Sequence, residues 1–132
     1  MIGACSWDIN KHKREDFCVM YEIRNYHFKP ELLSQYRQWA KTKAVPHLSK
    51  ELDVLGFWVN SEDPSEVTGE AQDKLGSANV TWIIRWRDLA HRNEVLPGVL
   101  GSPEWEAIFA HVPGGRSSYL RIENKFAESL TE

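Results

Sequence analysis

Four stretches of the chain alternate between two faces from one residue to the next, and this period of two predicts β-strands. They cover residues 17–26, 54–60, 79–87 and 118–124. The third stretch is the clearest, because every second position is large and apolar. These positions are Val80, Trp82, Ile84 and Trp86. In the second stretch, Gly56 indicates a β-bulge or a close approach of another group to the backbone.

The stretch that follows the first predicted strand repeats its apolar residues every three to four positions, as a helix does. Pro30 suits the first turn of this helix, which is expected to run to about Leu48. Pro46 lies inside it, and a proline there removes a hydrogen bond and opposes a carbonyl of the preceding turn. We therefore expect a kink or an end at Pro46.

The second half of the chain predicts two helical segments. The first covers 91–96 and is expected to break at Pro97 and Gly98. The second has Ser102 as N-cap and Pro103 in its first turn. The order of elements is then βαββαβ, which predicts an α+β, ferredoxin-like fold with an antiparallel sheet.

Both faces of the first and third predicted strands carry large or apolar side chains. The helices of this architecture cover only one face of the sheet, so the other face needs a partner. We therefore expect a homodimer in which two sheets pack against each other.

The ends of the chain and one connection have no clear period. Residues 1–16 end in a charge cluster and are expected to be a mobile N-terminal extension, with a domain over 17–126 and a tail over 127–132. Residues 60–78 are acidic and predict a long loop. Such a loop is either disordered or serves as a lid or a partner-binding segment.

The composition excludes several classes of protein. At 132 residues and 42% hydrophobic content, the chain is expected to form one packed domain. It has no apolar run long enough for a transmembrane helix. Its 16 basic and 19 acidic residues give a net charge of −3, which argues against a nucleic-acid partner. The sequence shows no signal-peptide core or lipidation motif, so we expect a cytoplasmic protein without a membrane partner.

The spacing of cysteine and histidine indicates no metal site. Cys5 and Cys18 form no CxxC pair and are expected to be reduced thiols. The histidines lack ligand spacing, so we expect no metal and no cofactor. Spacing does not exclude haem, which needs only one axial histidine.

A reaction without a cofactor needs a proton acceptor, a group that stabilises an oxyanion and an apolar enclosure. His27 and His47 are candidate bases, because imidazole titrates near neutral pH. An exposed loop position for His27 and a helix-terminal role for His47 are the alternatives. His91 and His111 lie in helical segments, where they can cap or pack as well as act.

Charged residues of the predicted sheet form a second set of candidates. Glu22 and Arg24 share a face of the first strand, and we expect Arg85, Arg121 and Glu123 to lie across from them. This set is either a compensated structural network or a site for an anionic enol or carboxylate.

The aromatic content points to a bulky core or a large pocket. Six tryptophans are several times the usual share, and pocket walls are typically apolar and aromatic. The candidate substrate-binding residues are Tyr21, Tyr26, Tyr36, Trp39, Trp58, Trp82, Trp86, Trp105 and Phe109. For the tyrosines, a place in the core or in a dimer interface is the alternative.

Five short motifs resemble the NIPSNAP family in order and spacing, over residues 19–124. They are Tyr21-Glu22-Ile23-Arg24-Asn25-Tyr26, Lys29-Pro30, Gly56-Phe57-Trp58, Trp86-Arg87-Asp88-Leu89 and Pro103-Glu104-Trp105. The resemblance implies a ferredoxin-like protomer and a homodimer whose two sheets pack into a dimeric α/β barrel. It also implies a pocket in each protomer between sheet and helices. Ile84 stands where the family often has histidine, and His47 where it is more often apolar.

The resemblance implies no reaction, because this fold carries many activities. We interpret the chain as a small cofactor-independent enzyme of the isomerase, cyclase or lyase type, which moves a proton on an apolar metabolite of secondary metabolism. The alternative is a non-catalytic dimer that binds a ligand or acts as an adaptor. An open pocket containing a histidine or tyrosine favours the first, and a filled interior favours the second.

Overall fold

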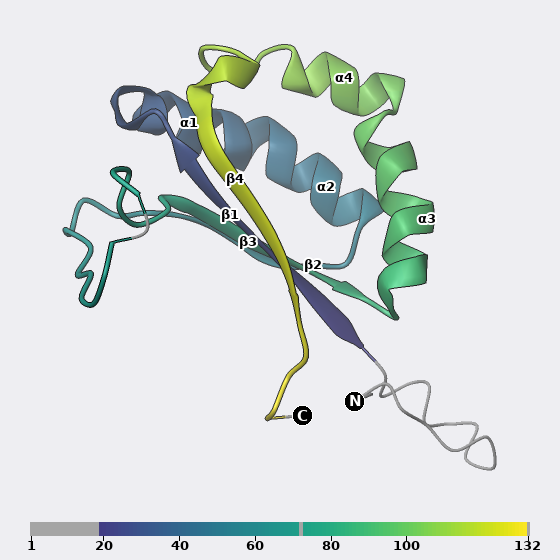
Figure 1. The fold of residues 1–132 in the computed structure, drawn as a ribbon. Helices are drawn as coiled ribbons and strands as arrows, with labels where there is room; N and C mark the ends of the chain where they lie inside the picture. The colour runs from purple at the N-terminus through teal and green to yellow at the C-terminus, as the bar shows by residue number, and fades with distance from the viewer. Residues whose placement is uncertain (1–18, 72, 132) are drawn as a thin grey trace.

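The computed structural model describes residues 19–71 and 73–131. Four antiparallel strands form one sheet in the order β2-β3-β1-β4 (Figure 1). The strands are β1 (Met20–Phe28), β2 (Val54–Val59), β3 (Val80–Trp86) and β4 (Tyr119–Ala127). The predicted α+β, ferredoxin-like fold is confirmed. The predicted N-terminal extension and both cysteines lie outside the described residues.

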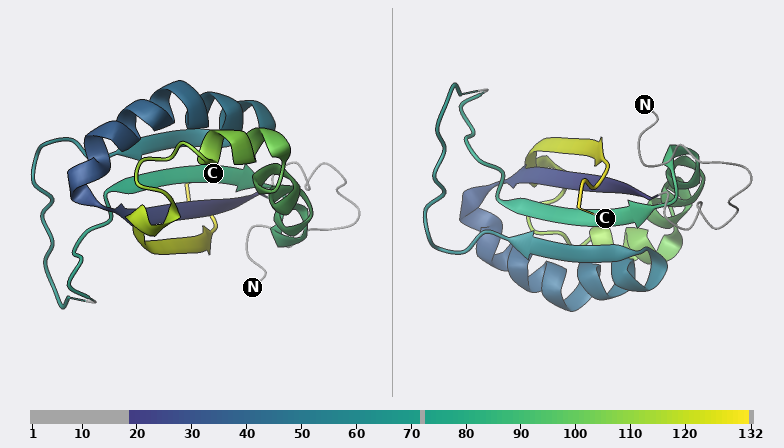
Figure 2. Two further views of the ribbon diagram at one scale, coloured as in Figure 1. Left: turned by 90° about the horizontal axis from the view of Figure 1, so that it is seen from above. Right: turned by 90° about the horizontal axis from the view of Figure 1, so that it is seen from below.

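The helices all lie on one face of the sheet. They are α1 (Leu33–Trp39), α2 (Val45–Glu51), α3 (Leu89–Leu100) and α4 (Pro103–Phe109). Seen from above, helices cross over the strands, whereas the view from below shows the four strands without a helix in front of them (Figure 2). The helix-facing side therefore holds the core, and the other side has no cover from the described residues of this chain.

Pro46 does not end the first helix, so one of the two outcomes expected at this proline, an end of the helix, is wrong. α1 and α2 are joined by a π-helical turn, Ala40–Ala44, and Pro46 lies in the first turn of α2. A π-turn widens the helix by one residue, so the carbonyls before the proline are not arranged as in a regular α-helix. The widened turn thus accommodates the ring that would otherwise interrupt the helix.

The predicted break at Pro97 and Gly98 is also wrong. α3 begins at Leu89, runs through both residues and ends at Leu100. Leu96 is buried and Val99 packs against the core, so apolar contacts lie on both sides of the proline. This packing outweighs the roughly 3 kcal/mol that proline costs inside a helix.

The core between sheet and helices is built mainly from aromatic rings. Phe28 of β1 is fully buried and contacts Tyr36 of α1 at a centroid distance of 4.4 Å. The Trp39 indole donates to the carbonyl of Ile108 at 3.1 Å and so ties the first helix to α4. The large rings keep the helices away from the sheet, because their bulk spans the gap between the two layers.

The structure shows both a β-bulge and a close approach of another group to the backbone at Gly56, the two features that the sequence indicated. The register of β2 against β3 shifts between Val54 and Gly56, which is a β-bulge. The ring of Trp58 lies over Gly56, where a Cβ atom would collide with it. Trp58 itself is 52% exposed on the edge strand.

Residues 60–79 connect β2 to β3 without a helix or strand among their described residues. This acidic connection extends away from the sheet (Figure 1). Its beginning is held by Arg37, which donates to the carbonyl of Asn60 at 2.7 Å. Asp73 makes an ion pair with Arg121 of β4 at 3.3 Å.

Candidate functional site

A cavity of about 220 Å³ lies between the helix-facing side of the sheet and the helices. Its walls are mostly aromatic. Of the residues that the sequence singled out, Arg24, Tyr26, Tyr36, Trp39, Trp82, Trp105 and Phe109 line it. Phe57, Tyr119 and Arg116 complete the aromatic and charged part of the wall. The cavity is thus an apolar enclosure with a few polar groups, as small-molecule sites usually are.

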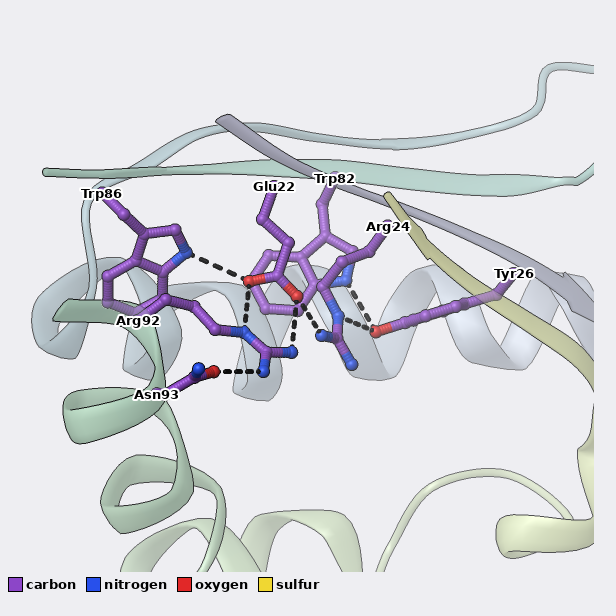
Figure 3. Close-up of polar contacts among 7 residues, drawn as sticks. All are labelled: Glu22, Arg24, Tyr26, Trp82, Trp86, Arg92 and Asn93. Carbon is purple, nitrogen blue, oxygen red and sulfur yellow. Dashed lines mark hydrogen bonds and ion pairs between the residues drawn. The ribbon is translucent and has the colours of Figure 1, made fainter. Parts of the chain in front are cut away.

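A buried carboxylate lies beside this cavity, on β1. Glu22 is fully buried, and four hydrogen bonds occupy its two oxygens (Figure 3). Oε1 accepts from Trp86 Nε1 at 3.0 Å and from Arg92 Nε at 3.1 Å. Oε2 accepts from Arg24 Nη1 at 2.6 Å and from Arg92 Nη2 at 3.1 Å. The carboxylate is therefore saturated with charged and neutral donors.

The strand register brings these groups together. Alternate residues of β1 face the helices, and β1 pairs with β3 so that Met20 is opposite Trp86 and Arg24 is opposite Trp82. Asp88 caps α3 by accepting from the backbone N–H of His91 at 2.8 Å. This cap starts the helix at the end of β3, so Arg92 lies one turn in and its guanidinium contacts Glu22.

The charges around Glu22 keep it ionised. Burial by itself would raise the pKa of Glu22, but the hydrogen bond from Arg92 and the charge of Arg24 outweigh burial and lower the pKa. Glu22 is therefore a countercharge at neutral pH. It is not available as a base, since both of its oxygens are already occupied.

Arg24 and Tyr26 present unused donors beside this network. The hydroxyl of Tyr26 accepts from Arg24 Nε at 2.7 Å and from Trp82 Nε1 at 2.9 Å. A hydroxyl has two acceptor positions and one proton, so the Tyr26 proton remains to be donated. Neither this proton nor the Nη2 amino group of Arg24 has an acceptor among residues 19–71 and 73–131. Both residues line the cavity.

Two further tyrosines of the wall are neutral phenols. Burial raises the pKa of Tyr36, and the neighbouring Tyr119 raises it further. Burial likewise raises the pKa of Tyr119. The described wall contains no carboxylate and no histidine. At neutral pH, the side chains of the cavity therefore offer proton donors and positive charge.

Several candidates from the sequence lie elsewhere. The expectation that Arg85, Arg121 and Glu123 lie across from Glu22 is wrong, because they pair with Tyr21, His27 and Asn25 on the opposite face of the sheet. Trp58 is also opposite a residue of that face, Thr81. His27 and Tyr21 therefore cannot contribute to this cavity. The reason is the strand register, which the sequence does not reveal.

His47 and Trp86 lie near the site without lining the cavity. His47 stacks on Trp105, a residue of the wall, at a centroid distance of 6.1 Å. Trp86 donates to Glu22 and so belongs to the charge network. Sequence reasoning missed Arg92. The signal that could have found it is the Asp88 cap, which places residue 92 one turn into a helix that begins directly after a strand.

The described residues show no metal centre. In the ranges 19–71 and 73–131, His, Cys, Asp and Glu side chains form no group of three or more that could hold an ion. Nor does any helix in these ranges have the length and apolar character needed to cross a membrane.

Comparison with solved structures shows which known proteins share this architecture. An uncharacterized NIPSNAP-like domain protein from Burkholderia xenovorans superposes with a TM-score of 0.66 and 16% identity, covering 86% of this chain and 87% of that chain. A NIPSNAP family protein of unknown function from Agrobacterium tumefaciens gives 0.65 and 18%, covering 84% and 87%. The chain shares the fold of the NIPSNAP family. The fold that the motif resemblance implied is therefore confirmed.

A further solved structure resembles this chain with a lower TM-score. A Bacteroides thetaiotaomicron protein, named as a candidate antibiotic biosynthesis monooxygenase, gives a TM-score of 0.51 at 16% identity and covers 85% of this chain and 90% of that chain. No family model matches the sequence. No curated protein matches it either. The comparisons therefore establish the fold, and the activity has to be argued from the cavity.

The charge network makes a prediction about stability. Glu22→Gln keeps the shape of the side chain but leaves Arg24 and Arg92 without their countercharge. We expect the free energy of unfolding to fall by about 3–5 kcal/mol, measured by urea denaturation. Arg85→Met is the control, because it removes an ion pair to Asp53 that is roughly half-exposed on both sides, and it should change stability little.

The stability lost in the Glu22→Gln variant should depend on pH. Because the pKa of Glu22 is lowered by folding, its contribution is present above the usual glutamate value of 4.5 and is lost as pH falls through the folded-state pKa. The stability difference between wild type and Glu22→Gln should therefore shrink in acid. A difference that is small at neutral pH, or independent of pH, would contradict the network.

Proposed function

We propose that the protein is a cofactor-independent enzyme that acts on a small, flat, apolar molecule through a carbonyl or enolate oxygen. The observation that carries this proposal is the pair of unused donors, Arg24 Nη2 and the Tyr26 hydroxyl, on the wall of an aromatic cavity. Donors without acceptors in an enclosed site favour a ligand whose oxygen accepts hydrogen bonds.

The chemistry that suits these donors is isomerisation or elimination through an enolate. When a proton leaves the carbon beside a carbonyl, negative charge develops on the oxygen. A fixed guanidinium and a phenol stabilise that charge strongly because little water surrounds them. Since the described wall holds no carboxylate or imidazole, the proton acceptor for this reaction has to come from outside that wall.

The composition of the wall also favours a second candidate, a protein that binds the same class of molecule without transforming it. General acid–base catalysis typically contributes a hundredfold or more and depends on a placed proton acceptor. The described wall supplies donors but no such acceptor. The open cavity, in contrast, argues against an adaptor whose interior is completely filled.

Binding and chemistry are tested with two small probes. Wild type should bind 2-naphthoate more tightly than the neutral 2-naphthamide in calorimetric titration. Tyr26→Phe and Arg24→Met should each weaken 2-naphthoate about tenfold or more, since hydrogen bonds to charged groups contribute about 1.5–3 kcal/mol. Arg37→Met changes an exposed residue of α1 that does not line the cavity, and it should bind 2-naphthoate like wild type.

The reaction is followed with 2-tetralone in deuterated water by proton NMR. Wild type should accelerate exchange beside the carbonyl, and Tyr26→Phe should slow it. Binding without acceleration would favour the second candidate. Equal affinity of wild type, Tyr26→Phe and Arg24→Met for 2-naphthoate would contradict both candidates.

We also propose that a second copy of the chain covers the face of the sheet opposite the helices. Ile23 and Ile83 are opposite each other at the centre of this face, and the largely exposed Trp58 extends the apolar area. Charged residues of both signs, Lys125 and Glu123, belong to the same face on β4. A twofold-related copy can therefore bury the apolar centre and match opposite charges.

The dimer is tested by sedimentation equilibrium. Wild type should show twice the 15.3 kDa of one chain. Ile83→Asp places a charge at the centre of the face and should shift the protein to single chains, whereas Leu89→Asp changes an exposed residue of α3 and should not. A single-chain mass for wild type would overturn this proposal.

A further inference from the structure

A second arginine in the cavity wall indicates which class of molecule the cavity binds. Arg116 lines the same cavity as Arg24 but is exposed, whereas Arg24 is buried. One guanidinium therefore lies in the interior and the other at the opening. The space between them is enclosed by aromatic rings, including those of Trp105 and Phe109.

The turn before β4 holds Arg116 in place. Gly114 and Gly115 have φ values of +72° and +78°, which suit glycine only, and a Cβ atom on Gly114 would collide with Ser118. The fully buried Ser118 donates to the carbonyl of Pro113 at 2.9 Å and closes the turn. The guanidinium of Arg116 then lies 5.0 Å from the centre of the Phe109 ring, against the cavity wall.

The charges of the site do not balance. Glu22 is the carboxylate that faces Arg24 and Arg92, so this group retains one positive charge. In the part of the chain that the structure describes, Arg116 has no carboxylate partner within ion-pair distance, and it adds a second positive charge. A cavity with apolar walls and two positively charged arginines suits an anionic ligand.

We infer that the substrate is an amphiphilic acid with two oxygen-bearing groups on a flat apolar body. The inner oxygen accepts from Arg24 and Tyr26, as in the proposed function on which this inference rests. The outer group is a carboxylate that pairs with Arg116 at the opening. Arg116 is thus a specificity-determining residue, which selects molecules with this outer carboxylate over molecules of the same shape without it.

The test compares 2,6-naphthalenedicarboxylate with 2-naphthoate by calorimetric titration. Wild type should bind the dicarboxylate about fivefold more tightly, as an ion pair near the surface contributes up to about 1 kcal/mol. Arg116→Gln should abolish this preference and leave 2-naphthoate unchanged, and Arg116→Lys should retain part of it. Because Arg116 is exposed, added salt should weaken the preference.

The outcomes separate this inference from the proposed function. If wild type binds both probes equally and Arg116→Gln changes neither, the inference is overturned while the cavity remains a binding site. If wild type binds neither probe, both proposals fail. Arg37→Gln changes an exposed arginine of α1 that does not line the cavity; it is the matched control and should preserve the preference of wild type for the dicarboxylate.

Discussion

The burial of Glu22 is the constraint on which the rest of the site depends. A carboxylate without access to water is tolerated only when donors surround it, because removing a charge from water costs several kcal/mol. Arg24, Arg92 and Trp86 provide these donors from β1, α3 and β3. The carboxylate therefore fixes the distance between the sheet and α3, in addition to balancing charge.

The same network determines what the cavity can do. Arg24 is held on one side by Glu22 and Tyr26, so only its Nη2 amino group is left without a partner among the described residues. Its guanidinium also lies 5.4 Å from the centre of the Trp82 ring, which limits its movement. A donor fixed in this way stabilises an oxyanion without rearranging during a reaction. Structural charge balance and the proposed chemistry thus rest on one group of side chains.

The sequence predicted the layers of the fold and one face of the site. The period of two in β1 placed Glu22 and Arg24 together, because alternation alone decides which residues share a face. The period does not give the register between strands, so Arg85 was expected beside Glu22 although it lies on the other face. Proline effects were overestimated at Pro46 and Pro97, because a π-turn and apolar packing compensate for them.

A crystal structure of the protein bound to 2-naphthoate should show that Arg24 and Tyr26 present free donors to an open aromatic cavity. We expect the naphthalene ring to lie between the aromatic walls, with a carboxylate oxygen about 3 Å from both Arg24 Nη2 and the Tyr26 hydroxyl. A cavity filled by its own side chains, or a carboxylate bound away from Arg24 and Tyr26, would contradict it.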